Sequence, residues 1–311
     1  MQNLNRDGNL VRLPIRELSE KTGVGTSTLR AWERRYGLLA PERTPKGHRL
    51  YSLDDVRLIQ RVLTLLEEGH SLPAIASKIK PSNESLGVAV PIQTIDDIWS
   101  EYLHATLLAI EEFSTERLES IFNEASSIYP VDLVTERLIE PALLALGSRW
   151  QDRELGIAEE HFYSNWLRNR IGARFHHAIG QAQGARIICA GIPGAHHEIG
   201  LLLFSLMALS RGYRVLYLGV DLPLEQVPLV VRQSASRGVV LACRNKVDES
   251  LHASLAQLSI DMDVPVMLGG MCGDEPLDVF EQAGGIRLGA RVSTALKVLA
   301  THVPAFSGGY R

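Results

Sequence analysis

The pattern of hydrophobic positions changes twice along the chain and predicts three kinds of structure. Up to Gly69, short stretches with apolar residues at helical spacing alternate with turn residues. From residue 92 to about residue 181, apolar residues recur every three or four positions over longer stretches, as in amphipathic helices. After Gly184, short β-rich runs alternate with helical segments. We therefore expect a small helical domain, a helical bundle and an α/β domain, in that order.

The first segment has the spacing of a helix-turn-helix. Leu13–Ser19 predicts a short helix, Thr22–Gly25 a turn, and the following residues a second helix that ends at Leu39–Pro41. Thr26 or Ser27 suits the N-cap of that second helix, because a side-chain oxygen at this position accepts a backbone N–H.

A wing and a further helix are expected next. Thr44–Tyr51 predicts a tight hairpin, and Gly47 permits its turn. Ser52–Asp55 supplies a capping box for a helix that runs through Glu68 and is closed by Gly69. The head of the chain is thus predicted to be an all-α unit with a small wing.

The last segment predicts a doubly wound parallel sheet of Rossmann-like type. Helices are expected at 201–211 and 225–237, between the strands. Alternating strands and helices form a parallel sheet covered on both faces, and ligands of such sheets bind at the carboxyl ends of the strands. The expected strands are 185–190, 214–218, 239–243, 265–268 and 285–288.

A polar stretch with Pro and Gly, from Lys80 to Pro91, predicts a linker. The chain is therefore expected to be multidomain, combining a winged helix-turn-helix, a helical bundle and an α/β doubly wound sheet. The expected boundaries are 1–80 for the head, 81–91 for the linker, 92–181 for the bundle, 182–302 for the α/β domain and 303–311 for a tail.

Charge is unevenly divided between these parts. Residues 1–80 hold 14 Lys and Arg against 9 Asp and Glu, a balance of +5, which leaves −9 for the remainder of a chain with net charge −4. A basic head on an acidic body directs the head at polyanions. We expect the polyanion to be double-stranded DNA.

Other functional classes are disfavoured by what the sequence contains. The three cysteines include no pair at metal-ligand spacing, so neither a disulfide framework nor a zinc site is indicated. The printed sequence has neither an apolar run long enough to span a membrane nor a signal peptide at its start. We expect a cytoplasmic protein that does not enter membranes.

The head closely resembles the N-terminal domain of MerR-type transcriptional regulators. The resemblance covers about the first quarter of the chain and rests on Leu29–Leu38, which includes Trp-Glu-Arg-Arg-Tyr-Gly, and on the wing Gly47–Tyr51. It implies a recognition helix in the major groove of promoter DNA and a wing on the flanking backbone. Some arginines are expected only to form surface pairs, as Arg34 would with Glu33, and Trp32 is expected to pack against the wing. The implied DNA contacts are Thr26, Thr28, Arg30, Arg34, Arg35, His48, Arg49 and Tyr51.

A loop with two histidines, Pro193–Gly200, follows the first expected strand of the sheet. A neutral imidazole is a good ligand for a transition metal, although such a pair is more often solvated or helix-capping. In context, the final two-thirds of the chain resembles the cobalamin-binding module of light- and cobalamin-responsive MerR-type repressors and of methionine-synthase-like proteins. That resemblance makes His197 the axial ligand to cobalt. The other implied cofactor contacts are Trp150, Glu160, His161, Gly200, Gly219, Asp221, Gly269 and Gly270.

The chain departs from that pattern near the axial histidine. Ala195 stands where the family has an acidic residue that orients the imidazole, and loss of such a partner costs about 10–100-fold in metal affinity. Glu198 or His196 are the alternatives for this role. Ala242–Cys243 occupies the place of an expected Ser, Arg244 adds a charge near the expected nucleotide-tail cavity, and Gln151 stands where some light-sensing relatives have a second His.

Three functional hypotheses follow. The leading one is a transcriptional regulator in which cobalamin, in the adenosyl form, sits between bundle and sheet and controls a homo-oligomer (dimer or tetramer) or the placement of the head, with light as one trigger. The second keeps the DNA-binding head but gives the cofactor-free remainder a role in oligomerisation or partner docking. The third, a cobalamin-dependent methyltransferase or mutase, lacks the substrate barrel of about 250 residues. We therefore do not expect an enzyme.

Overall fold

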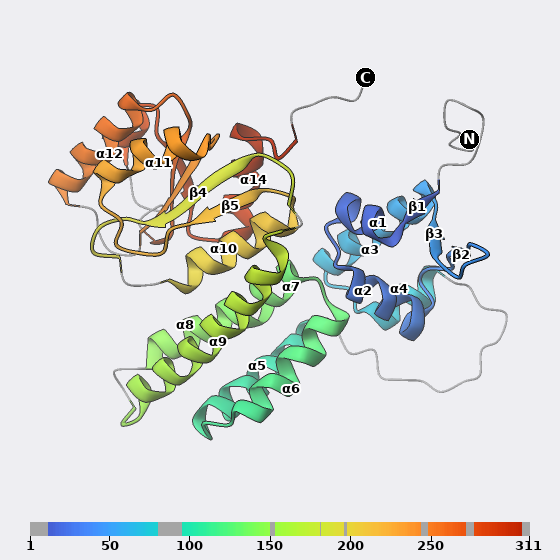
Figure 1. Cartoon of the computed structure of the whole chain (residues 1–311). Helices are drawn as coiled ribbons and strands as arrows, with labels where there is room; N and C mark the ends of the chain where they lie inside the picture. The colour runs from blue at the N-terminus through green and yellow to red at the C-terminus, as the bar shows by residue number, and fades with distance from the viewer. Residues whose placement is uncertain are drawn as a thin grey trace, which may run out of the picture. The chain divides into compact units, whose positions relative to one another are not determined.

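The computed structural model describes residues 12–79, 95–149, 153–180, 182–195, 198–243, 248–271 and 277–306. It divides the chain into two compact units, Met1–Glu160 and His161–Arg311 (Figure 1). The predicted fold class is confirmed, because a helix-turn-helix is followed by a helical region and by a five-stranded parallel sheet. The finer domain boundaries at 80, 91, 181 and 302 stay predictions.

The head has the wing that the sequence predicts. Its three short strands pair antiparallel in the order β1-β3-β2, and Gly47 at φ 83° lies in the turn between β2 and β3. The elements are β1 Leu13–Pro14, α1 Ile15–Thr22, α2 Thr26–Ala31, the π-helical turn η1 Trp32–Tyr36, β2 Glu42–Arg43, β3 Arg49–Tyr51, α3 Leu53–Glu67 and α4 Leu72–Ile79.

Two local expectations in the head are wrong. Gly25, and not Thr26 or Ser27, occupies the N-cap position of α2, and no side chain caps this helix. The recognition helix also ends at Tyr36 rather than at 39–41, because Gly37 takes a left-handed conformation with φ 58°. The apolar Leu38 and Leu39 that suggested a longer helix are instead buried beyond its end.

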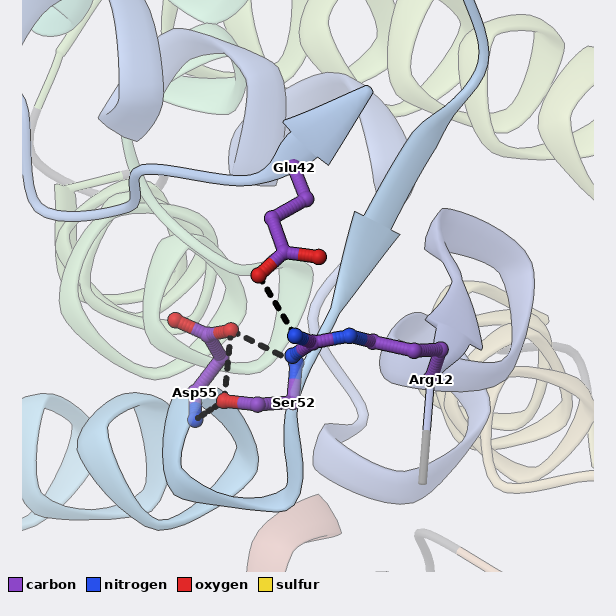
Figure 2. A network of polar contacts seen from close by, with 4 residues as sticks. All are labelled: Arg12, Glu42, Ser52 and Asp55. Carbon is purple, nitrogen blue, oxygen red and sulfur yellow. Dashed lines mark hydrogen bonds and ion pairs between the residues drawn. The ribbon is translucent and has the colours of Figure 1, made fainter. Parts of the chain in front are cut away.

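The cap of α3 is confirmed. The Ser52 hydroxyl accepts the Asp55 N–H at 3.1 Å, and the Asp55 carboxylate accepts the Ser52 N–H at 2.7 Å (Figure 2). Beside this box, Arg12 forms an ion pair with Glu42 and so links the chain before β1 to β2. The capping box thus begins α3 directly after β3, and the ion pair holds β2 to the start of the wing.

Between residues 95 and 178 the chain forms helices, as the spacing of its apolar residues predicts. Within the first unit, α5 packs against α6 and α8. The π-helical turn η2 ends two residues before Pro141, whose ring lacks the N–H that a regular helix would use there. The elements are α5 Ile95–Glu111, α6 Thr115–Ile128, α7 Val131–Val134, η2 Thr135–Ile139, α8 Glu140–Arg149 and α9 Gly156–Ala178.

The α/β part is a parallel sheet with strand order β5-β4-β6-β7-β8. The order reverses at β4, so the carboxyl edge near this strand is the switch point where such folds bind ligands. The strands are β4 Arg186–Gly191, β5 Arg214–Tyr217, β6 Val239–Ala242, β7 Val266–Gly269 and β8 Ile286–Gly289. The helices that follow them are α10 Ile199–Ser210, α11 Val227–Ser234, α12 Glu249–Asp261, α13 Asp278–Gln282 and α14 Val292–His302.

Helices cover both faces of this sheet. One core joins alternate residues of β4, β6 and β7 to apolar residues of α11, α12 and α13. On the other side, α10 packs against β4, β5 and α14, and every residue from Leu201 to Leu209 is buried. Neither this helix nor any other in the described part of the chain is long and apolar enough to cross a membrane.

Candidate functional site

The head presents a basic face on its recognition helix. Arg30, Arg34 and Arg35 are exposed on α2 and η1, and Thr26 is partly exposed at the start of α2. His48 is exposed in the wing. A shallow hollow of about 580 Å³ is lined by Arg30, Arg34, Arg35 and Arg49, among others. Four guanidinium groups around one hollow form a surface suited to phosphate oxygens.

The surface-pair alternative expects Glu33 to pair with Arg34. In the structure, Glu33 pairs with arginines of the wing instead. Its carboxylate lies 2.8 Å from Nε of Arg49 and 4.0 Å from Nη2 of Arg43. The hydrogen bond from Arg49 to Glu33 raises the pKa of that guanidinium above its usual value. Through this contact Arg49 holds the wing to the recognition helix. Arg49 also lines the hollow.

Two of the predicted DNA contacts lie in the core of the head. Thr28 is 4% exposed and Tyr51 is fully buried. Burial, reinforced by Glu33, raises the pKa of Tyr51 to about 12. The expectation of direct contact is therefore corrected for both residues: they face inward on α2 and β3, where they shape the head without reaching its surface.

Trp32 connects the recognition helix to the helical region. Its side chain is fully buried, and its indole N–H donates to the carbonyl oxygen of Ile128 at 2.7 Å. Ile128 is the last residue of α6, so this bond satisfies a carbonyl that the helix leaves open at its end. The sequence predicts that Trp32 packs against the wing. It contains no local signal for a hydrogen-bond acceptor 96 positions away in the chain.

The carboxyl edge of the sheet brings together the predicted glycines and Asp221. The Gly194 N–H donates to Oδ1 of Asp221 at 2.8 Å, and the Gly191 N–H donates to the Gly219 carbonyl at 2.8 Å. These bonds join the loop after β4 to the loop after β5. Gly269 ends β7 and Gly270 follows it at the same edge, where the Gly269 carbonyl accepts the Cys243 N–H at 2.9 Å.

The glycines at this edge differ in what surrounds them. At Gly194, Gly200 and Gly219 an added Cβ would meet nothing within 4 Å, so a flat ligand has room to approach the backbone. At Gly270, with φ 98°, the Cβ would lie 2.1 Å from the Cys243 carbonyl oxygen, so this glycine is required by close backbone packing. Of the predicted glycines at this edge, Gly200 and Gly219 are therefore open, whereas Gly270 is closed off by the backbone.

Glu198 is the residue beside the predicted axial ligand in the sequence. Its carboxylate accepts the Tyr217 hydroxyl at 2.9 Å and lies 3.3 Å from Nε of Arg168 on α9. Burial, with Glu198 adding to it, raises the pKa of Tyr217 above its ordinary value. The sequence does not predict Tyr217 or Arg168 as part of this region, because they come from two other elements.

Several predicted residues lie outside the described part of the chain, and two others lie on α9. Trp150, Gln151, His196, His197 and Arg244 are outside the described residues. Within α9, Glu160 is partly exposed and His161 exposed, whereas Glu159 is buried and lies 3.6 Å from Arg153. Within the described ranges, no group of three or more His, Cys, Asp or Glu is placed to hold a metal ion.

Comparison with known families matches two segments of the chain. Residues 13–80 match the MerR HTH family regulatory protein, and residues 102–174 match the B12 binding domain. The chain joins a MerR-type domain to a B12-binding domain. Both resemblances inferred from the motifs are therefore confirmed at the level of domains.

Curated relatives align with the chain over most of their length. The chain is 28% identical over 263 residues to the HTH-type transcriptional repressor CarH of Myxococcus xanthus, covering 81% of this chain and 86% of that protein. It is also 28% identical over 278 residues to the repressor CarA of the same organism, covering 88% and 91%. These homologues are regulators and not enzymes, in agreement with the prediction.

A solved structure supports the fold of the rear part. The Methanosarcina barkeri monomethylamine corrinoid protein aligns with a TM-score of 0.51 and 15% identity, covering 65% of this chain and 99% of that one. At this identity the likeness concerns the fold alone. It agrees with a helical region followed by a parallel sheet of the type that the sequence predicts.

Proposed function

We propose that this protein is a DNA-binding transcriptional regulator that takes cobalamin, in the adenosyl form, as its signal. The observation that carries the proposal is the presence, in one chain, of an exposed arginine face on a MerR-type recognition helix and of a helical segment that matches the B12 binding domain, followed by a parallel sheet with open glycine positions at its carboxyl edge. The first supplies the contact with DNA, and the second supplies a site for a large planar cofactor.

The proposed DNA contacts are those of the predicted set that reach the surface. Exposed arginines neutralise phosphates and read guanine edges in the major groove. The wing, fixed by the Glu33–Arg49 pair, supports contacts to the flanking backbone. The set consists of Thr26, Arg30, Arg34, Arg35, His48 and Arg49.

The proposed cofactor contacts come from both sides of the predicted site. His197 is the proposed axial ligand to cobalt, and Trp150, Glu160 and His161 are proposed for the opposite face. When bound, adenosylcobalamin supplies a visible chromophore and a light-sensitive cobalt–carbon bond. The proposed sheet-side contacts are Gly200, Gly219, Asp221, Gly269 and Gly270.

Cofactor binding controls DNA binding by favouring one arrangement of the protein over another. A ligand shifts such an equilibrium only through its different affinities for the two arrangements. We propose that the favoured arrangement is a homo-oligomer, because joining several heads increases the affinity for repeated half-sites without new contacts. Light is the proposed trigger, because the bound cofactor would supply a light-sensitive bond whose loss would change the affinity for the two arrangements.

The test is a titration of the full chain with adenosylcobalamin in the dark, followed by visible absorbance and by gel filtration. The wild-type protein should retain colour, and His197→Ala should lose at least about 10-fold in affinity, because cobalt loses its protein ligand. Green light should change both the elution volume and the binding of duplex DNA. A protein that stays colourless at saturating cofactor would refute the cofactor role.

That negative result would favour the second candidate function. The buried Ala195 and Cys243 stand where the cobalamin-binding family has polar residues, and this favours a cofactor-free oligomerisation module. Under this alternative the oligomer is the same with and without adenosylcobalamin, whereas DNA binding is retained.

A further inference from the structure

The hollow beside the recognition helix is not built by the head alone. Besides the four arginines it is lined by Ser127, which lies in the last turn of α6 in the helical region. Both parts belong to the same compact unit, Met1–Glu160. The MerR-type segment ends at residue 80, so the proposed DNA surface continues onto a helix outside that segment.

The end of α6 is held against the recognition helix by buried contacts. Trp32 donates its indole N–H to the Ile128 carbonyl at 2.7 Å, and both side chains are buried. Tyr129, the residue after α6, is buried as well and packs against Trp99 of α5, with ring centres 4.7 Å apart. Because Ser127 directly precedes Ile128, these contacts also fix Ser127 beside the hollow.

The recognition helix keeps one side open while α6 flanks it. Residues two positions apart on a helix point in nearly opposite directions, so Arg30 and Arg34 point away from the contact of Trp32 with α6. The hollow extends from these arginines around the helix to Ser127. A helix with its side chains is about 10–12 Å across and the major groove is about 12 Å wide, so the helix fills the groove. The hollow at its side therefore lies where the sugar-phosphate backbone would pass.

The charge around the hollow favours a phosphate, although two features oppose it. The carboxyl end of α6 is equivalent to about half a negative charge. Glu33 also lines the hollow, where its carboxylate pairs with Arg49 at 2.8 Å. The four guanidinium groups outweigh both and leave an excess of about two to three positive charges.

The Ser127 hydroxyl is able to donate to a phosphate oxygen at little cost. It is partly exposed and donates to the Glu124 carbonyl at 2.8 Å. A helical carbonyl at this position also accepts the backbone N–H four residues later, so it stays satisfied when the hydroxyl rotates away. We propose that Ser127 binds a backbone phosphate of duplex DNA, so that the helical region supplies a contact beside the recognition helix. This inference rests on the proposed DNA-binding function.

The test adds a positive charge at this position. Ser127→Lys is made in the full chain, and binding to a fluorescently labelled duplex of mixed sequence is followed by anisotropy over a range of salt concentrations. The protein is kept in the dark with adenosylcobalamin present. One further phosphate contact should steepen the slope of log K against log salt by about 0.9 for each bound head. Because this gain vanishes toward 1 M salt, binding at 0.1 M salt should be about 8-fold tighter than that of the wild type.

Ser148→Lys is the matched control. Ser148 is the last residue but one of α8, as Ser127 is of α6, and its hydroxyl likewise donates to the carbonyl three residues earlier, at 2.9 Å. It does not line the hollow. Ser148→Lys adds the same charge to the same unit and should change neither the slope nor the affinity.

Ser127→Ala tests the hydroxyl itself. This variant should bind about 2- to 10-fold more weakly with an unchanged slope, because it loses a hydrogen bond and no charge. The melting temperatures of all three variants are measured alongside. If Ser127→Lys melts at a lower temperature than the wild type, the alanine variant decides, and wild-type affinity in that variant would overturn the inference.

The slope separates contact with DNA from displacement of α6 by DNA. Tighter binding of Ser127→Lys with a wild-type slope would overturn the inference, since it would mean that loosening the end of α6 exposes the arginines. Equal steepening in Ser127→Lys and Ser148→Lys would overturn it too, because net charge alone would then account for the effect. A wild-type protein that binds no duplex DNA would refute the proposed function, and the Ser127 contact with it. A wild-type slope in Ser127→Lys beside normal DNA binding by the wild type would remove the Ser127 contact alone.

Discussion

At the scale of single residues, two buried tryptophans differ in how their polar atom is satisfied. Trp32 donates its indole N–H to Ile128, whereas Nε1 of Trp99 has no hydrogen-bond partner within the described residues. Trp99 instead packs its ring against Tyr102 and Tyr129 at 5.7 and 4.7 Å between ring centres. The sequence predicts that Trp32 packs against the wing but not this hydrogen bond, because its partner is distant in the chain.

Replacing each tryptophan by phenylalanine should therefore have unequal effects. Trp32→Phe leaves the Ile128 carbonyl without its donor and should lower the free energy of unfolding by about 1–3 kcal/mol beyond the loss of ring size. Trp99→Phe loses similar ring area but removes a donor that is already unsatisfied, so its cost should be smaller. Urea unfolding of the two variants measures the difference, and equal losses would contradict the assigned hydrogen bond.

The burial of Cys189 leads to a second prediction for a single residue, which concerns the reactivity of its thiol. Burial in β4 raises the pKa of its thiol to about 12. Because the thiolate is the reactive form, Cys189 should resist alkylation in the folded protein at pH 7 to 9. Mass spectrometry after iodoacetamide treatment should find Cys189 modified only once urea is added; modification without urea would show that this strand opens.

At the scale of elements, the sequence predicts what local chemistry determines. The capping box of α3 is visible because Ser52 and Asp55 are three positions apart, and β-rich runs predict the strands because their spacing is local. The end of the recognition helix is mispredicted because Gly37 stops it within an apolar run. The contact of Arg168 with Glu198 is missed for a different reason: it joins separate elements, and single-sequence patterns carry no signal for such pairs.

The cap of α3 can be tested by substitution. Ser52→Ala should destabilise the head by about 1 kcal/mol, because the Asp55 N–H loses its acceptor at the start of the helix. Amide hydrogen exchange should become faster in the first turn of α3. Ser77→Ala is the control, since that hydroxyl only donates back to the Ala74 carbonyl in α4; equal effects on the two helices would argue against a specific cap.

At the scale of the whole molecule, a basic head and an acidic remainder share one chain. The head should bind duplex DNA with a steep dependence on salt, because phosphate contacts release counterions. Arg34→Gln should weaken binding and reduce the slope of log K against log salt by about 1. Arg232→Gln, on α11 of the other unit, removes the same charge and should change neither quantity. Fluorescence anisotropy with a labelled duplex measures both, and equal effects would place the DNA contact elsewhere.

The boundary between the two compact units falls inside a continuous helix. α9 begins at Gly156, four residues ahead of the division, and continues to Ala178. Its first turns carry the buried Glu159, and a later turn carries the buried Tyr163. A protein truncated at His161 would begin in mid-helix, with a frayed end and exposed backbone donors. Anyone isolating the sheet for crystallography or labelling should therefore start the polypeptide before Gly156, so that the helix keeps its own beginning.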